Sequence, residues 1–142
     1  MALNADLALC HQETPISADN KVLTYPRTLV FNAPHEIADA LADAGFDGCD
    51  AASNHTYDHG LKGVNDTLDV LDAAGLVHTG PTRNQVEATE PPIFEVNGIK
   101  VGYLGFSYTI FNEGSPSQNV PNDAPWLESM LWPKVGIEGV LA

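Results

Sequence analysis

The apolar positions of this chain fall into short continuous runs and into longer stretches with helical spacing. Residues 5–12 form an apolar run with little alternation, which predicts a strand covered on both faces. Two further strands are predicted at 46–52, which is rich in small residues, and at 76–80. The chain therefore begins with the pattern of a buried parallel sheet.

Two stretches between these runs have apolar side chains at helical spacing. The first begins at Pro34, with Asn32 before it as a candidate cap, and ends at Gly45. The second covers about 61–74 and stops at Gly75. Strands that alternate with helices predict a layered α/β sheet, in which right-handed crossovers bring the loops after the strands to one edge.

The remaining segments are predicted to be a hairpin and loops. The dipeptide Asn97–Gly98 separates the apolar runs 92–96 and 99–106, and this pattern favours a type I′ turn. Residues 13–33 are predicted to be a long loop, whose length indicates a functional segment. The whole chain is interpreted as one domain whose C-terminal part, 107–142, is weakly structured.

Composition limits the class of protein and the kinds of macromolecule that this chain is expected to bind. The 142 residues are 44% hydrophobic, so one domain with a buried core is expected. The net charge of -13 argues against nucleic acid or an anionic membrane as a partner, because both reward clustered Lys and Arg. No apolar run approaches the ~18 residues needed to span a bilayer, so no direct membrane insertion is expected. Residues 1–9 lack the basic region of a secretory signal. Cys10 and Cys49 are too few for a disulfide scaffold and are interpreted as small buried hydrophobic residues.

Polar side chains follow the first predicted strand. His11 and Glu13 have the same parity, so they lie on one face if the strand continues. An imidazole and a carboxylate on one face form a plausible half of a divalent-metal shell. The alternative is that Glu13 caps the following turn and His11 bonds to the backbone.

A denser polar cluster follows the second predicted strand. The Asn54 carbonyl oxygen is a hard ligand for Mn, Fe or Mg, and His55 can coordinate or donate a proton to a leaving oxygen. Asp58 precedes a helix, so N-capping explains it as well as metal binding does. His35 and His78 are weaker candidates, and no phosphate-binding glycine loop or nucleophile elbow is present.

Three stretches together resemble the capsule-synthesis (poly-γ-glutamate synthesis) family, a branch of the calcineurin-like metallophosphatase superfamily. They are residues 5–17, residues 31–80, which contain the run Asn-His-x-x-Asp-x-Gly, and residues 91–109. The resemblance covers about two-thirds of the chain. It implies a layered α/β sandwich of the metallophosphatase type.

The resemblance also implies roles for individual residues. Glu13 matches a glutamate of the family, with His11 where many relatives have asparagine. Asn54 and His55 match the Asn-His pair in which Asn binds the metal and His helps to protonate the leaving group, and Asp58 matches the Asp after that pair. The implied cofactor is a divalent ion (Mn, Fe, Mg or Zn).

Several motifs of the superfamily are absent, so an incomplete domain is expected. The Gly-Asp strand would precede residue 1, and the His-Trp-Gly and Gly-His-x-His segments would follow residue 142. With few ligands left, weak metal affinity and little independent activity are expected. One hypothesis is a metal-dependent phosphoesterase or hydrolase, completed by missing segments or a partner chain. The other is a non-catalytic component of poly-γ-glutamate assembly.

By analogy, the expected partner is the polyanionic capsule polymer or its precursors, and the expected location is the cell envelope. If the chain is the full gene product, the absence of a signal or anchor predicts a cytoplasmic location instead. A homodimer or a companion chain is a further hypothesis, because the first strand lacks a neighbour and exposed strand edges invite pairing.

Overall fold

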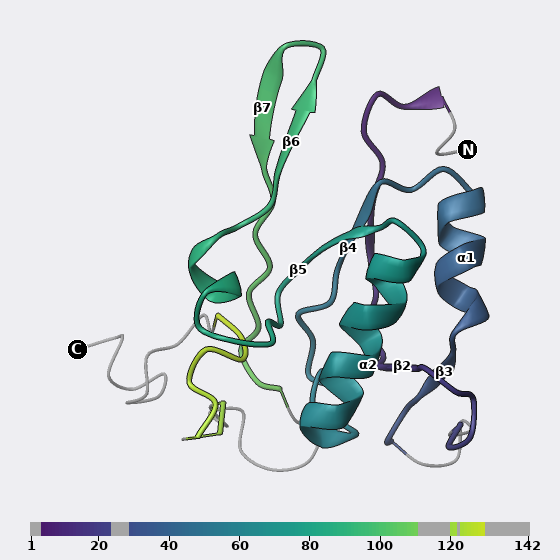
Figure 1. Cartoon of the computed structure of the whole chain (residues 1–142), viewed down its shortest axis with the longest axis vertical. Coiled ribbons are helices and arrows are strands. Elements are labelled where there is room, and N and C mark those ends of the chain that lie inside the picture. Colours follow the sequence, from purple (N-terminus) through teal and green to yellow (C-terminus); the bar gives the residue numbers. More distant parts are fainter. Residues whose placement is uncertain (1–3, 24–28, 111–119, 122, 130–142) are drawn as a thin grey trace.

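The computed structural model describes residues 4–23, 29–110, 120–121 and 123–129. Three parallel strands form its main sheet in the order β1 (Leu9–His11), β4 (Gly48–Asp50) and β5 (Val77–Thr79). The register places His11 beside Asp50, and Asp50 beside Thr79. Because the strands are parallel, their carboxyl ends lie at one edge of the sheet, which confirms the predicted α/β arrangement (Figure 1).

Two helices follow the strands, close to the predicted positions. Helix α2 (Gly60–Ala73) packs against β5, and its apolar stripe includes the fully buried Leu68 and Leu71. Helix α1 (Glu36–Asp43) is shorter than predicted and begins after Pro34. The N-cap of α1 is His35, which makes no side-chain capping bond, so the predicted start at Pro34 is wrong.

The predicted loop 13–33 contains a small structured element. Strand β2 (Ile16–Ser17) pairs in parallel with β3 (Ala33–Pro34). The backbone N–H of Ile16 donates to the hydroxyl of Thr67 in α2 at 2.8 Å, which ties this element to the helix. Two-residue strands leave no periodicity in a sequence, and for this reason they were not predicted.

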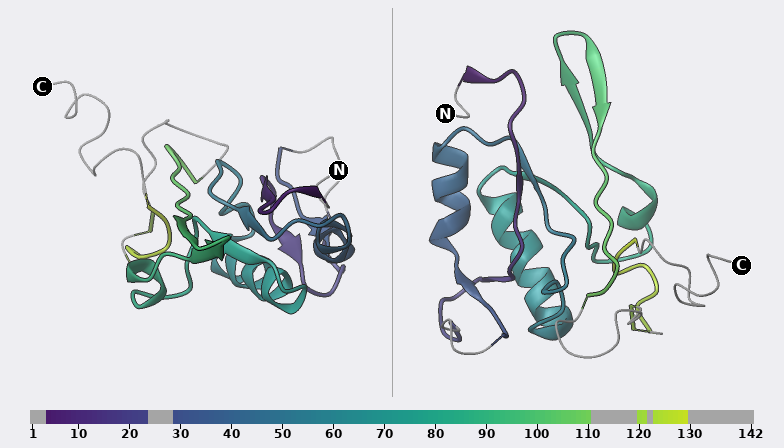
Figure 2. Two further views of the ribbon diagram at one scale, coloured as in Figure 1. Left: turned by 90° about the horizontal axis from the view of Figure 1, so that it is seen from above. Right: turned by 180° about the vertical axis from the view of Figure 1, so that it is seen from behind.

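The hairpin is confirmed. Strands β6 (Ile93–Val96) and β7 (Ile99–Gly102) pair antiparallel and project from the rest of the molecule (Figures 1 and 2). Between them, Asn97 and Gly98 both have positive φ, 51° and 79°, as a type I′ turn requires. A short 3₁₀ helix, η2 (Glu87–Thr89), precedes the hairpin.

The described part of the C-terminal segment is packed into the core. It has no helix there, and its β-structure is one isolated bridge between Pro81 and Glu128. Its apolar side chains nevertheless form a cluster with two residues of α2; the members are Val64, Leu68, Ile110, Val120, Ala124 and Leu127. The second cluster lies around β4; its members are Ile16, Ala38, Cys49, Leu71 and Leu76.

Cys10 and Cys49 are joined by a disulfide, with their Cα atoms 4.4 Å apart. The interpretation of both as unlinked hydrophobic residues is therefore corrected. They are direct neighbours in the register of β1 and β4, and this register cannot be read from cysteine spacing alone. Among the described residues, no helix has the length and apolar character needed to cross a membrane.

Candidate functional site

The first polar cluster stands where β1 and β4 end. His11 Nδ1 lies 3.2 Å from Asp50 Oδ2, and the other oxygen, Asp50 Oδ1, accepts the N–H of Ala52 at 2.8 Å. His11 and Glu13 are exposed, whereas Gln12 between them is buried. His11 is thus paired with a side chain of the neighbouring strand, and not with the backbone as the alternative interpretation proposed.

Glu13 lines a small pocket. The pocket measures about 10 Å³ and is also lined by Gln12, Ala51 and Thr56. A pocket of this size holds no more than a single water molecule or ion. The pocket brings Glu13 next to the segment that leads from β4 to Asn54, so the two predicted clusters lie at one sheet edge.

The second cluster is a compact turn built by two hydroxyl groups. The Thr56 hydroxyl accepts the N–H of Ser53 and donates to the carbonyl of Ala51, both at 2.9 Å. The Ser53 hydroxyl accepts the N–H of His55 at 3.0 Å. Asn54 is held between these bonds and is only partly buried. Local polar bonds, more than regular structure, fix the position of Asn54.

His55 and Asp58 form a buried pair. His55 Nδ1 lies 2.8 Å from Asp58 Oδ2, and the two side chains are only 7% and 4% exposed. The same carboxylate oxygen accepts the N–H of Phe31 at 2.7 Å. The Phe31 ring packs edge-on against the imidazole, with the ring centres 4.7 Å apart. The imidazole is therefore fixed by one polar and one aromatic contact.

Asp58 does not cap α2. The N-cap of this helix is His59, which makes no side-chain capping bond, and Asp58 instead binds His55 and Phe31. Asp58 lies in the turn that directly precedes the helix, before the N-cap His59. The capping interpretation is therefore replaced by a role in orienting His55.

The predicted metal ligands lie at one edge of the sheet but do not converge on a single point. Among the described residues, no group of three or more His, Cys, Asp or Glu side chains is placed to hold a metal ion. His11 and Glu13 stand at the same edge as Asn54 and His55, but they do not close a cage with them. The donor types suit a hard or borderline divalent ion, while the number of converging ligands is small.

Two acidic residues of this edge were missed in the sequence. Asp50 is the last residue of β4 and contacts His11; an acid at the end of a strand of small residues was a usable signal. Glu128 comes from the distant C-terminal segment and is 4% exposed, and neither carboxylate oxygen has a hydrogen-bond partner. Burial raises the pKa of Glu128 to about 9, and the nearby hydroxyls of Thr56 and Ser107 offset only part of this effect. Nothing in the local sequence marks Glu128.

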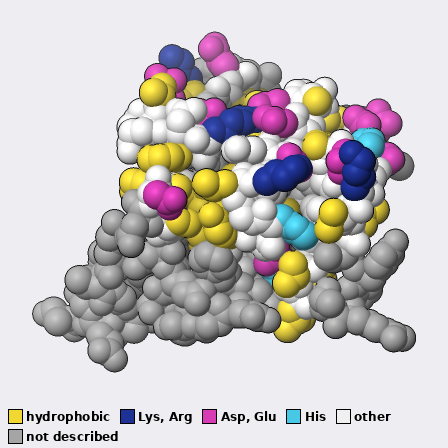
Figure 3. Space-filling view, turned by 60° about the horizontal axis from the view of Figure 1, so that its bottom comes forward, with side chains coloured by type: hydrophobic (Ala, Val, Ile, Leu, Met, Phe, Trp, Pro, Cys, Tyr) yellow, Lys and Arg dark blue, Asp and Glu magenta, His cyan; other side chains and the backbone are white. Residues whose placement is uncertain are grey.

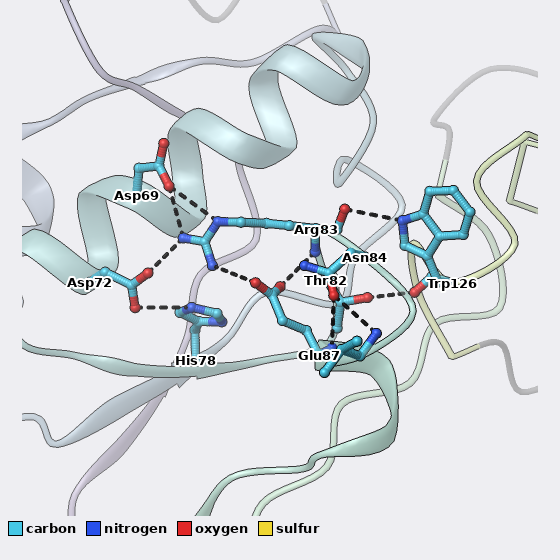
Figure 4. A network of polar contacts seen from close by, with 9 residues as sticks. Asp69, Asp72, His78, Thr82, Arg83, Asn84, Glu87 and Trp126 are labelled. Carbon is cyan, nitrogen blue, oxygen red and sulfur yellow. Dashed lines mark hydrogen bonds and ion pairs between the residues drawn. The ribbon is translucent and has the colours of Figure 1, made fainter.

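His78 belongs to a different network. Its Nε2 lies 3.2 Å from Asp72 of α2, and burial lowers the pKa of the imidazole. Arg83 binds Asp72, and also Asp69 and Glu87, through its guanidinium group (Figure 4). These contacts bind α2 to the segment after β5, and His78 takes part in this structural network through Asp72. His35 contacts Glu36 at 3.6 Å, at the start of α1.

Basic side chains are dispersed among acidic ones. On the face shown in Figure 3, each Lys or Arg lies beside Asp or Glu, and no continuous basic patch forms among the described residues. Lys21 pairs with Asp19, and Lys62 pairs with Asp66. The basic groups named here are therefore locally neutralised by acidic neighbours.

Comparison with known proteins gives a consistent family. Residues 2–134 match the family described as bacterial capsule synthesis protein PGA_cap. The chain is 29% identical over 106 residues to the capsule biosynthesis protein CapA of Bacillus anthracis, covering 73% of this chain and 26% of that protein. It is 24% identical over 114 residues to the PGA biosynthesis protein CapA of Bacillus subtilis (strain 168), covering 80% of this chain and 30% of that protein.

A third relative has no assigned function: the uncharacterized protein y4sH of Sinorhizobium fredii (strain NBRC 101917 / NGR234) is 29% identical over 90 residues, covering 63% of this chain and 19% of that protein. The chain thus spans less than a third of the length of each of these three relatives. The family match covers nearly the whole chain and agrees with the motifs at the strand edge. The chain belongs to the bacterial capsule synthesis protein family.

Proposed function

We propose that this strand edge is part of a divalent-metal site of the metallophosphatase type that serves capsule biosynthesis. The observation that carries the proposal is the buried His55–Asp58 pair in the turn beside Asn54. A buried carboxylate that orients an imidazole at the end of a parallel strand is an arrangement suited to proton transfer. Family membership supports the same interpretation.

In this proposal, Asn54, His11 and Glu13 would hold the ion (Mn, Fe, Mg or Zn). The chemistry that such an ion supplies when bound is stabilisation of negative charge on the attacked group. His11 contributes a ring nitrogen, and Asp50 sets its orientation through the 3.2 Å contact. Glu13 is exposed and therefore accessible to an ion at the edge.

His55 is the proposed proton donor. Asp58 engages Nδ1, which leaves Nε2 as the ring nitrogen for proton exchange with a leaving oxygen. One oxygen of Asp58 already accepts from two groups, His55 and the N–H of Phe31. We therefore propose an orienting role for Asp58 in place of the metal-binding role considered from the sequence.

The proposed substrates are a polyanionic capsule polymer or its precursors. The B. subtilis relative is named a PGA biosynthesis protein, which supports this choice. A chain with a net charge of -13 repels a polyanion, so a bound cation would be needed to bring substrate and site together. A second copy or a companion chain would supply further ligands, and size measurement in solution would detect such an assembly.

A second candidate is a non-catalytic component of capsule polymer assembly. It is favoured by the small number of converging ligands among the described residues. In this version the strand edge binds a metal ion weakly and serves attachment, without turnover. Rapid hydrolysis of a generic aryl phosphate by the purified chain would exclude this alternative.

Calorimetric titration with Mn²⁺ tests the metal site. We expect the full chain to bind Mn²⁺ with a dissociation constant below about 1 mM, which corresponds to a binding free energy of more than about 4 kcal/mol. Asn54→Ala should weaken binding by roughly tenfold or more, a typical loss when support for a metal is removed. The matched control is Asn65→Ala, since Asn65 is an exposed asparagine of α2.

Two results would contradict the proposal. One is binding no tighter than about 1 mM by the unmodified chain. The other is equal affinity of Asn54→Ala and Asn65→Ala. His55→Ala should leave most of the affinity while removing any phosphatase activity, because we assign His55 to proton transfer.

A further inference from the structure

Glu128 reaches the strand edge from the far end of the described chain. Its segment is held by backbone bonds on both sides: the N–H of Thr82 donates to the carbonyl of Leu127 at 2.7 Å, and the N–H of Ser107 donates to the carbonyl of Ser129 at 3.2 Å. The carbonyl of Trp126 also accepts from the Thr82 hydroxyl (Figure 4). The position of Glu128 is therefore well fixed by its neighbours.

The carboxyl group of Glu128 has no donor to neutralise a negative charge. It is 4% exposed, and neither oxygen has a hydrogen-bond partner. The nearby hydroxyls are those of Thr56 and Ser107. Each is already committed as a donor: Thr56 donates to the carbonyl of Ala51, and Ser107 donates to the carbonyl of Thr109. A hydroxyl that donated to an ionised Glu128 would therefore have to give up its present acceptor.

An ionised carboxylate in this position would face hydroxyl protons that are already bonded to carbonyl groups, and the negative charge of Asp50 on β4. Among the described residues, Asp50 is the charged group that acts on Glu128. Such an environment disfavours ionisation, whereas a neutral carboxylic acid can donate its proton to one of the hydroxyls. The structure therefore favours the protonated form of Glu128.

Thr56 connects this group to the functional turn. Its hydroxyl closes the turn by bonding Ser53 and Ala51, and Asn54 and His55 stand in that turn. An ionised Glu128 would compete for the Thr56 proton and draw it away from Ala51. A neutral Glu128 leaves this bond intact and adds a donor to the free lone pair of the hydroxyl.

We propose that Glu128 is a positioning residue, which as a neutral acid supports Thr56 and thereby holds the turn that carries Asn54 and His55. The functional value of this role rests on the proposed metal site. The coupling between Glu128 and Thr56 does not depend on that site, and it can be measured without a metal. The role also gives the C-terminal segment a purpose beyond filling the core.

Nuclear magnetic resonance of the full chain tests the coupling. The carboxyl ¹³C signal of Glu128 and the methyl signal of Thr56 are followed from acid to alkaline pH. We expect Glu128 to remain protonated through neutral pH and the Thr56 methyl signal to shift when Glu128 ionises. That shift should persist in the control Glu95→Gln, since Glu95 is exposed on the hairpin, and should vanish in Glu128→Gln.

Titration of Glu128 in the ordinary acid range would overturn the proposal, and this measurement is made on the unmodified chain. A Thr56 profile that is the same in Glu128→Gln as in the unmodified chain would also overturn it. In a Mn²⁺ titration near neutral pH, Glu128→Gln should keep the affinity within about twofold, whereas Glu128→Leu should lose roughly tenfold. If the unmodified chain binds no Mn²⁺, the metal proposal fails while the resonance result still decides the role of Glu128.

Discussion

The substitution Glu128→Gln should stabilise this protein, and increasingly so as the pH rises. Burial raises the pKa of Glu128 from its ordinary 4.5 to about 9 in the folded chain. Between these two values the folded state holds a proton that the unfolded state releases, so the free energy of unfolding falls as the pH increases. Glutamine has no proton to lose, and its amide keeps a donor for the hydroxyl of Thr56.

The magnitude follows from the width of the pH window. Each pH unit between the unfolded and folded pKa values costs the wild-type chain about 1.4 kcal/mol. From pH 4.5 to pH 7 the window is roughly 2.5 units, so the advantage of Glu128→Gln should grow by about 3 kcal/mol. The loss would continue toward pH 9, where Glu128 ionises in the folded chain as well.

Urea denaturation at several pH values between 4.5 and 8 measures this difference. The quantity that matters is the change with pH, because any fixed cost of burying the glutamine amide cancels. The control Glu95→Gln should run parallel to the wild-type chain, as its carboxyl group is exposed. Parallel profiles for Glu128→Gln and wild type would contradict this prediction and show that Glu128 is ionised when folded.

Two further substitutions test the packing of the strand edge. Asp58→Ala removes the acceptor of two buried donors, one of them His55 Nδ1. It should lower the free energy of unfolding by about 1–3 kcal/mol for each donor left unpaired. Equal stability of Asp58→Asn and Asp58→Ala in urea denaturation would show that the acceptor is unimportant. Gly105→Ala would place a Cβ atom 2.2 Å from Asp50 Oδ1, so thermal denaturation should show a loss of about 1–3 kcal/mol. Gly102→Ala is its control, because nothing lies within 4 Å of that Cβ position, and equal melting temperatures for the two variants would contradict the predicted clash.

Local patterns in the sequence were sufficient for the elements that bury one face or form a tight turn. The bounds of α2 were predicted to within a residue from its apolar stripe, because Val64, Leu68 and Leu71 are all buried on one side of the helix. Leu61, which was also assigned to this stripe, is 40% exposed. The hairpin was predicted from Asn97–Gly98, since few other pairs tolerate two positive φ angles. The short strands β2 and β3 were missed, because two residues cannot establish a period.

The edge at which the candidate residues lie was predicted, but their contacts were not. Strand ends in a parallel sheet share an edge, so His11 and Asn54 could be placed together in advance. The sequence could not show that Asp58 would bind His55 instead of capping α2, because both roles suit an acid at that position. Asp58 meets His55 within the turn that the Thr56 hydroxyl closes, and this turn is a feature of the folded chain.

Local sequence patterns were enough to predict the strands of the main sheet, the two helices, the hairpin and the polar groups at the strand ends. These features depend on local periodicity and composition, which neighbouring residues establish among themselves. By contrast, the pairing of Cys10 with Cys49 and the burial of Glu128 beside Thr56 depend on tertiary packing. Such contacts join segments tens of residues apart, so they exist only once sheet register and core packing have brought the segments together.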